Sequence, residues 1–161
     1  MPVRDVLHDL DTLTITFTAE FAATANRVWE VYTNPRQLER WFGPPTYPAT
    51  FVDHDLRPGG RATYFMTSPE GEKFGGWWEF TTVEAPSHLA FDDGFADADL
   101  HPVDTMPVSH NDYRFSEDSG TTTVVTVSTY DSAEALQKVL DMGVLDGATM
   151  SINQIDALLR A

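Results

Sequence analysis

Histidine and carboxylate side chains lie close together at two places, where they could support acid–base catalysis or metal binding. In the segment Asp53-His54-Asp55, alternation along a strand puts the imidazole on the opposite face from both carboxylates. A solvated strand edge therefore explains this segment better than a catalytic site. His110 and Asp112 would share one face of a later strand, but two side chains do not make a metal site. We predict no metal at either place.

The sequence also lacks the short motifs that mark catalytic and cofactor sites. Its five histidines are scattered, and none follows another at the H-x-x-x-H spacing of a helical zinc site. No nucleophile elbow of the form G-x-S-x-G and no dinucleotide fingerprint occurs. The glycine-rich segment 57–60 joins two predicted strands instead of opening a helix, so it is a turn. We predict that the protein uses no cofactor, and we assign no catalytic residue.

The C-terminal stretch 131–160 has the pattern of a long amphipathic helix with unusual residues on its apolar face. Asp131 and Glu134 fit a capping box, and apolar side chains recur at helical spacing from Leu136 to Leu158. Each glycine inside a helix costs about 1 kcal/mol relative to alanine. The face must therefore need either open space or close backbone contact, and the sequence leaves both explanations open. The small or polar residues on or near this face are Gly143, Gly147, Ser151 and Gln154.

The rest of the chain predicts strands and two short helices. Residues 13–21 alternate strictly between apolar and polar side chains, as in a half-buried strand. Thr24 and Asn34 have the residue types of helix N-caps, and Gly43 ends the second helix. The remaining predicted strands, separated by turn residues, are 47–56, 61–67, 74–83, 89–95, 108–115 and 121–129.

These elements predict an α+β fold. Strands joined by short hairpins should form an antiparallel sheet, and one face of that sheet must be covered. The C-terminal helix, roughly 40 Å long at about 1.5 Å per residue, could cross a curved sheet of seven strands. We expect one domain, residues 1–161, with an ordered core from about 13 to 160.

Composition restricts the partners that the protein can have. The 161 residues include 10 Lys and Arg against 25 Asp and Glu, which gives a net charge of −15. Nucleic acid and anionic membrane surfaces would repel such a chain, so neither is expected as a partner. No segment reaches the roughly 18 apolar residues of a membrane span, and the first residues lack the apolar core of a signal peptide. The absence of cysteine leaves the compartment open, and the cytoplasm is the default expectation.

Three segments carry a resemblance to a known family: residues 55–61 (DLRPGGR), residues 83–89 (VEAPSHL), and the C-terminal positions 142–148 with 155–159. They resemble the START-like (SRPBCC) superfamily, and most closely its branch named after the activator of the heat-shock protein 90 ATPase. The resemblance implies a helix-grip fold, in which a curved seven-stranded antiparallel sheet and two short helices hold a long C-terminal helix over a cavity. The superfamily includes lipid carriers, aromatase/cyclase-like enzymes and hormone receptors. The resemblance is therefore more specific for fold than for function.

By this resemblance, alternate residues on several strands would face the cavity. Tyr64 and Met66 share one strand face, and Val125, Val127 and Thr129 would form the concave face of the last strand. An apolar lining with a few polar groups is the usual composition of a small-molecule site. The residues expected to contact a ligand are Trp41, Phe42, Tyr64, Met66, Trp78, Phe80, Asn111, Tyr113, Val127, Gly147, Ser151 and Gln154.

We expect a protein that binds a small hydrophobic molecule, aromatic or lipid-like, rather than an enzyme. One alternative is a polyketide cyclase- or aromatase-like enzyme, in which Tyr64, His110 or Tyr113 would move protons. A second alternative is a co-chaperone that activates the heat-shock protein 90 ATPase. The small acidic domain has no additional chaperone-binding module, which argues against a chaperone partner. The sequence leaves open whether the chain forms a homodimer.

Overall fold

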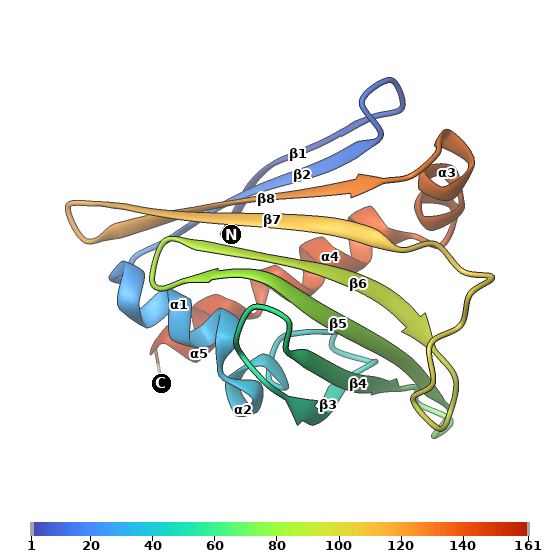
Figure 1. Ribbon diagram of the computed structural model, residues 1–161. Coiled ribbons are helices and arrows are strands. Elements are labelled where there is room, and N and C mark those ends of the chain that lie inside the picture. The colour runs from blue at the N-terminus through green and yellow to red at the C-terminus, as the bar shows by residue number, and fades with distance from the viewer. Residues whose placement is uncertain (1, 161) are drawn as a thin grey trace.

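The computed structural model describes residues 2–160 of the chain (Figure 1). Two strands and two short helices come first, six strands follow, and the last part of the chain is helical. The strands are β1 (Val3–Asp9), β2 (Thr14–Phe21), β3 (Ala49–His54), β4 (Arg61–Thr67), β5 (Lys73–Glu84), β6 (His88–Ala96), β7 (Ser109–Asp118) and β8 (Thr121–Tyr130). The helices are α1 (Ala25–Thr33), α2 (Pro35–Leu38), α3 (Ala133–Asp141), α4 (Val144–Asn153) and α5 (Ile155–Arg160).

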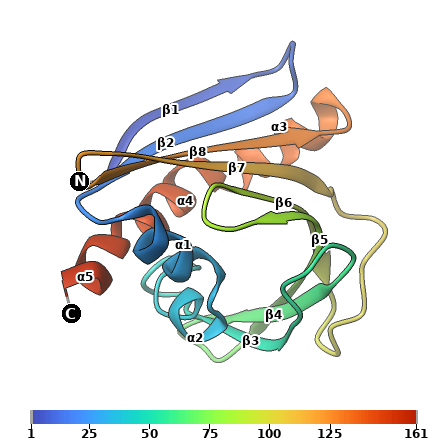
Figure 2. The same ribbon diagram turned by 60° about the vertical axis from the view of Figure 1, so that its left-hand side comes forward.

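Within residues 2–160 the strands form one antiparallel sheet in the order β1-β2-β8-β7-β6-β5-β4-β3. Each strand from β3 to β8 pairs with its neighbour in the chain, and β2 pairs with β8 along its whole length. The sheet curves strongly, so that β1 and β2 lie opposite β3 and β4 (Figure 2). Helix α4 runs across the concave face between these two sides. The sheet and α4 together therefore enclose the interior of the molecule.

The sheet has eight strands, so the prediction of seven was wrong. The additional strand, β1, pairs with β2 at the edge of the sheet, and most of its side chains are exposed. Within β1 only Val3 and Val6 are half-buried, and they do not alternate as in a strand with one covered face. Periodicity alone cannot identify an edge strand that buries so little.

Helices α1 and α2 close one end of the concave face and lead the chain toward the interior. Thr24 caps α1 by accepting the backbone N–H of Arg27, and Asn34 caps α2, as the sequence predicted. After α2, the indole N–H of Trp41 donates to the carbonyl of Val31 at 2.9 Å. This hydrogen bond fixes the aromatic side chains that follow α2 against the first helix.

The C-terminal stretch is not one long helix, contrary to the pattern. Gly143 has a left-handed conformation, with φ of 84°, and separates α3 from α4, while Gln154 separates α4 from α5. A side chain at this φ would be strained, so glycine is what permits the first break. Helix α3 is capped by Ser132, whose hydroxyl accepts the N–H of Ala135, and not by Asp131 as predicted. No helix within residues 2–160 is both long enough and apolar enough to cross a bilayer.

Aromatic rings fill much of the concave side between the sheet and the helices. Phe42, which follows α2, lies edge-on to Tyr64 and to Trp78, with ring centroids 5.2 Å apart in both pairs. Trp78 in turn lies 4.4 Å from Phe91 on the next strand. Such offset and edge-on pairs contribute about 0.5–1.5 kcal/mol each beyond their buried area. This aromatic cluster packs beside the cavity described below, and Phe42 and Tyr64 belong to both.

Candidate functional site

A cavity of about 390 Å³ lies between the concave face of the sheet and α4. Its wall is formed by β2, α1, the segment after α2, β4 to β8, and the two sides of the α3–α4 junction. Most of the lining is apolar or aromatic, and polar side chains gather on β6, β7 and β8. Small-molecule sites typically have volumes of about 300–1,000 Å³ and this kind of lining.

Most of the residues expected at a ligand site line this cavity. Tyr64 and Met66 face it from β4, and Asn111 and Tyr113 face it from β7, because alternate residues on a strand share one face. Contact between these side chains and a ligand stays a prediction. The predicted residues that line the cavity are Trp41, Phe42, Tyr64, Met66, Asn111, Tyr113, Gly147 and Ser151.

Trp78 and Phe80 do not line the cavity, although both point to the concave side. Their side chains are at most 2% exposed. Phe51 and Phe91 lie against the Trp78 ring, with centroids 5.3 and 4.4 Å away, and Phe91 also lies 6.2 Å from Phe80. Neighbouring rings therefore occupy the space around them, and they belong to the core.

Val127 faces the opposite side of the sheet from the cavity, and so do Val125 and Thr129. The family resemblance had implied that these three residues form the concave face of the last strand, and this prediction was wrong. In β8 the residues that follow buried Val124 on the same face of the strand carry hydroxyl groups, and they form part of a polar wall. The residues of β8 that line the cavity are Thr126, Ser128 and Tyr130.

Gln154 is not on the cavity wall; it holds the chain beside the cavity mouth. Its Nε2 donates to the carbonyl of Trp41 at 3.1 Å and to the carbonyl of Gly43 at 2.9 Å. Both carbonyls lie in the segment that follows α2. The amide therefore ties the end of α4 to that segment and fixes the relative position of two parts of the wall.

Gly147 leaves open space at the wall contributed by α4. A β-carbon at this position would have a single neighbour within 4 Å, the Cγ atom of Pro44 at 3.8 Å. Close packing of helix on sheet therefore does not explain this glycine. One turn later, the Ser151 hydroxyl donates to the Gly147 carbonyl at 2.9 Å. The structure supports open space, which was one of the two explanations left by the sequence.

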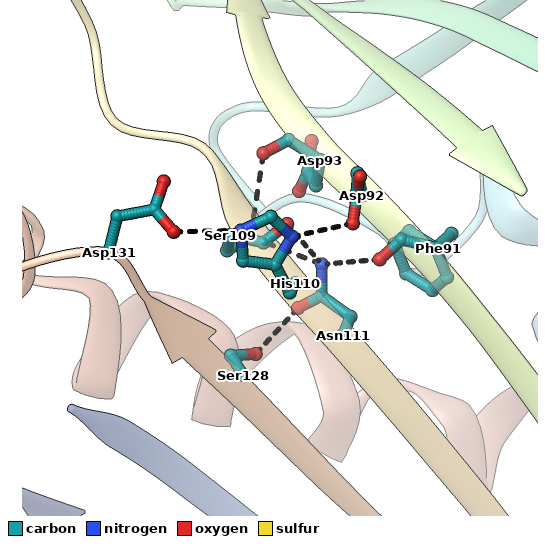
Figure 3. Close-up of polar contacts among 8 residues, drawn as sticks. All are labelled: Phe91, Asp92, Asp93, Ser109, His110, Asn111, Ser128 and Asp131. Atoms are coloured by element: carbon teal, nitrogen blue, oxygen red, sulfur yellow. Dashed lines mark hydrogen bonds and ion pairs between the residues drawn. The ribbon is translucent and has the colours of Figure 1, made fainter. Parts of the chain in front are cut away.

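A hydrogen-bonded network on β7 and β8 forms the polar part of the wall. The Ser128 hydroxyl donates to Oδ1 of Asn111 at 2.6 Å (Figure 3). The Nδ2 group of Asn111 donates to Oγ of Ser109 at 3.1 Å and to the carbonyl of Phe91 at 3.2 Å. Because protein groups bind both ends of this buried amide, its orientation is fixed. The network holds two serine hydroxyls in place at the cavity wall.

Asp93 is the strongest candidate for ligand recognition, and the sequence prediction missed it. Its side chain lines the cavity, and its Oδ1 accepts a hydrogen bond from the Tyr64 hydroxyl at 2.8 Å. The indole N–H of Trp78 approaches the same carboxylate but makes no regular hydrogen bond within residues 2–160. Burial raises the pKa of Asp93 to about 7, and the approaching Tyr64 and Trp78 donors oppose part of that rise.

A signal for Asp93 was nevertheless present in the sequence. Leu89 and Phe91 are buried on β6, and Asp93 is the next residue on the same face. The predicted strand 89–95 already contained Asp93, but acidic side chains surround it in the sequence, and such residues usually face solvent.

Gly76 gives the Tyr64 ring the room to reach Asp93. The two residues are partners in the β4–β5 ladder, and a β-carbon on Gly76 would overlap the Tyr64 ring. The phenol therefore lies across β5 and brings its hydroxyl to β6. The glycine is a determinant of the site although it makes no polar contact.

The hydroxyl of Tyr32 is another polar group at the cavity, and within residues 2–160 it has no protein partner. Tyr32 comes from α1, is buried and lines the cavity, and its hydroxyl has no hydrogen-bond partner within residues 2–160. Its ring is held between Trp41 and Phe115, with centroids 4.8 and 5.2 Å away. Leaving a buried hydroxyl unpaired costs about 1–3 kcal/mol. A ligand atom that bonds this hydroxyl would recover that energy.

His110, considered above as a proton carrier, lies outside the cavity. Its Nδ1 is 2.8 Å from Asp92, and its Nε2 is 3.0 Å from Asp131 at the start of the C-terminal region (Figure 3). The hydrogen bond that His110 donates to the Asp92 carboxylate is the main cause that raises the pKa of His110. His110 therefore joins β7 to β6 and to the segment after β8 on the other face of the sheet, and it has no access to a ligand in the cavity.

The loop between β6 and β7 brings together three exposed side chains with metal-binding atoms. Ligand atoms of Asp97, Asp99 and His101 lie within 4.8 Å of one another. However, Oδ1 of Asp97 already accepts the backbone N–H groups of Asp99 and His101, at 2.9 and 3.0 Å. This is the hydrogen bonding of a tight Asx-type turn, which explains the cluster without an ion.

Comparison with known proteins identifies the family to which this geometry belongs. The family model described as Activator of Hsp90 ATPase homolog 1-like protein matches residues 22–160. This range begins at the end of β2 and includes every later element of the structure. No curated protein matches the chain.

Solved structures share the fold over nearly the whole chain. Protein Ms6760 from Mycobacterium smegmatis is 63% identical, with a TM-score of 0.90 over 98% of this chain and 97% of that protein. A protein from Arthrobacter aurescens is 47% identical, with a TM-score of 0.93 over 97% of this chain and 91% of that one. A protein from Staphylococcus epidermidis is 31% identical, with a TM-score of 0.84 over 98% and 94% of the two chains.

These matches agree with the segments that carried the resemblance at the level of sequence. The curved antiparallel sheet, with a helix across its concave face, is the architecture that the resemblance implied. The chain belongs to the Activator of Hsp90 ATPase homolog 1-like family and has its START-like fold.

Proposed function

We propose that the protein binds a small, mainly apolar molecule in the cavity between the sheet and α4. The observation that carries this proposal is the cavity of about 390 Å³ with aromatic walls and a few converging polar groups. Among those groups, the Asp93 carboxyl and the Tyr32 hydroxyl have bonding capacity that the protein leaves unused. Polar groups of this kind fix the orientation of a ligand that the apolar wall holds.

The mouth of the cavity gives further support. Phe74 and Met142 line the cavity and are also 51% and 56% exposed. Apolar surface therefore continues from the interior to the outside of the molecule, and exposed apolar patches commonly mark binding grooves. Gly147, on the α4 side, keeps the interior free of a side chain.

The proposal is tested by filling the cavity from the α4 side. In Gly147→Leu the new side chain occupies space that a ligand needs, whereas Gly147→Ala adds one carbon where only Pro44 is near. The measurements are thermal shifts against a panel of apolar compounds and native mass spectrometry of freshly purified protein. We expect compounds that stabilise the wild type to stabilise Gly147→Ala equally. Their affinity for Gly147→Leu should be at least about tenfold weaker.

The two variants also separate occlusion from damage to the fold. Gly147→Ala should raise the free energy of unfolding by up to about 1 kcal/mol, because alanine favours the helix interior. If Gly147→Leu folds and binds every compound as tightly as the wild type, the cavity is not the binding site. The proposal also fails if no compound in a broad apolar panel shifts the melting temperature and no adduct is found.

One observation favours catalysis in the same cavity as a second candidate function. The Tyr64 hydroxyl and the Asp93 carboxyl form a hydrogen-bonded pair, and a carboxyl group with a pKa of about 7 can exchange protons at neutral pH. A cyclase or aromatase acting on a poly-β-keto chain would use such a pair. Turnover of a poly-β-keto thioester that survives both Asp93→Asn and Tyr64→Phe would exclude this pair as its catalyst.

The family description names an activator of the Hsp90 ATPase, and that activity is not part of the proposal. Apart from Phe74 and Met142 at the mouth, the cavity residues named above are mostly interior groups, which suit a small molecule better than a protein partner. Our expectation that the protein has no chaperone partner stays a prediction. Stimulation of an Hsp90 ATPase by saturating amounts of this protein would contradict it.

A further inference from the structure

We propose that the ligand of this cavity carries a cationic nitrogen that pairs with the carboxylate of Asp93. The inference rests on the proposed function, because it names the chemistry of the molecule that the cavity would hold. The class of ligand is a primary, secondary or tertiary amine attached to an aromatic or aliphatic body.

The charges on the cavity wall are the first argument. Asp93 is the one carboxylate among the lining residues within 2–160, and none of those residues is a lysine, arginine or histidine. A carboxylate removed from water requires a compensating charge or a full set of hydrogen bonds. The protein supplies no charge here, so a cationic ligand would complete the site.

The hydrogen bonds of Asp93 are the second argument. The Tyr64 hydroxyl donates to it at 2.8 Å, and the Trp78 indole N–H approaches it from β5. Both groups are donors, and donors stabilise the ionised form of a carboxyl group. Both are also neutral, so they orient the carboxylate without satisfying its charge. A ligand ammonium group would meet a carboxylate that is already oriented.

The aromatic wall around Asp93 is the third argument. Tyr64, Tyr113 and Tyr130 lie near enough to interact with its charge, and they come from β4, β7 and β8. Trp41 and Phe42 add further rings to the same cavity. The faces of such rings attract cations, including alkylated ammonium groups. A wall of this kind therefore favours a cation and accommodates its apolar body.

Ligands of other charge fit these features less well. A fatty-acid carboxylate would bring a second negative charge near Asp93, and no basic residue of the described wall would neutralise it. A neutral alcohol could donate a hydrogen bond to Asp93 but would leave its charge uncompensated. The net charge of −15 also concentrates cations, not anions, around the molecule.

Three probes with one apolar body and different head groups test the inference: naphthylmethylamine, naphthylmethanol and naphthoic acid. Their dissociation constants are measured by isothermal titration calorimetry at pH 8, where Asp93 is ionised and the amine is still largely protonated. We expect the amine to bind wild-type protein at least about tenfold more tightly than the alcohol, because hydrogen bonds to charged groups are strong. The acid should bind most weakly.

Asp93→Asn and Asp92→Asn form the matched pair of variants. Asp92 is the adjacent residue, carries the same charge and contacts His110 on the other face of the sheet. Asp93→Asn should lose the preference for the amine and keep the affinity for the alcohol, which also shows that this variant is folded. Asp92→Asn should bind all three probes as the wild type does.

A pH series provides an independent readout of the same group. The titratable groups that face Asp93 are Tyr64, Tyr113 and Tyr130, and burial raises the pKa of each phenol above its usual range. These phenols stay neutral between pH 5.5 and 8, so Asp93 is the group expected to change charge. Affinity for the amine should therefore fall toward pH 5.5 in the wild type and stay constant in Asp93→Asn.

The results distinguish failure of this inference from failure of the proposed function. If the alcohol binds and the amine binds no more tightly, the cavity is a ligand site, but the inference that its ligand carries a cationic nitrogen is wrong. The inference is equally wrong if Asp93→Asn keeps the full preference for the amine. If none of the three probes binds the wild type, the inference fails, and the broad apolar panel described above decides the proposed function separately.

Discussion

Asp93 shows how a single half-buried carboxyl group can make the stability of the whole fold depend on pH. Its pKa is about 7 in the folded protein, and its ordinary value is 3.8. The folded state therefore holds this proton more tightly than the unfolded state does. The cost of burying the charge is absent below about pH 4, grows as the pH rises, and is complete above pH 7.

We predict that Asp93→Asn stabilises the protein at pH 8 and has much less effect at pH 4.5. A difference of about three pKa units corresponds to an upper limit of about 4 kcal/mol. Asparagine keeps an oxygen that can accept the Tyr64 hydroxyl. Urea unfolding at both pH values measures the effect.

Asp104→Asn is the control for this prediction, because Asp104 is exposed in the loop between β6 and β7. It should change the free energy of unfolding by less than about 0.5 kcal/mol at either pH. A destabilisation by Asp93→Asn at pH 8 would show that the ionised carboxylate supports the empty fold.

Residue by residue, the sequence predicted the apolar part of the site better than its polar part. Strand phase together with the family resemblance placed Tyr64, Met66 and Asn111 on the cavity wall, where the structure has them. The prediction was wrong at Val127 and did not include Asp93, and both residues lie on strands that carry the polar wall. The rule that apolar side chains point inward holds for a core, but a cavity with a polar wall reverses it locally. The alternation of apolar and polar residues does not show which strands carry the polar wall, because that depends on how the strands and helices pack.

At the scale of elements, Gln154 couples the end of α4 to the segment after α2. Its two hydrogen bonds, at 3.1 and 2.9 Å, cross from the C-terminal helices to the carbonyls of Trp41 and Gly43. The pattern marked Gln154 as unusual for an apolar helix face, which was correct. Its partners lie more than 100 residues earlier in the chain, so the sequence could not identify them.

We predict that Gln154→Ala lowers the free energy of unfolding by about 1–3 kcal/mol, because it leaves two carbonyl groups without their donor. Amide hydrogen exchange in residues 41–48 should become faster. Gln137→Ala removes an exposed glutamine of α3 that bonds Asp141, and it should cost less than about 0.5 kcal/mol. Unchanged exchange in residues 41–48 would mean that this segment is held by other contacts.

The sequence also did not predict the break in the C-terminal helix, because two glycines with different roles look the same in it. Gly143 and Gly147 looked alike, since both interrupt an apolar helix face. In the structure Gly143 has φ of 84° and divides α3 from α4, whereas Gly147 lies inside α4 beside open space. Glycine permits both uses, and only the backbone conformation distinguishes them.

At the scale of the whole molecule, charge is the most unusual property. With 25 acidic and 10 basic side chains, the folded protein carries a net charge of −15. The acidic residues of such a chain repel one another more strongly when the chain is compact. Salt reduces this repulsion, because the Debye length falls from about 30 Å at 0.01 M to about 8 Å at 0.15 M.

We therefore predict that NaCl raises the melting temperature of the ligand-free protein between 0.01 and 0.3 M. Relief of about 1 kcal/mol would correspond to about 2–4 °C for a chain of this size. Differential scanning calorimetry measures the shift, and sucrose at matched osmolarity is the control for effects that do not involve charge. A lower melting temperature in salt would mean that specific ion pairs outweigh the general repulsion.

The cavity also affects how long the protein survives. A cavity of about 390 Å³ leaves the side chains of its wall with fewer packing contacts than a solid core would provide. A ligand that occupies it restores those contacts and, at a hundred times its dissociation constant, shifts the folding equilibrium by about 2.7 kcal/mol. Proteases cleave the open chain, so the occupied protein should resist digestion far longer than the empty one. In a cell, the amount of this protein would then follow the supply of its ligand.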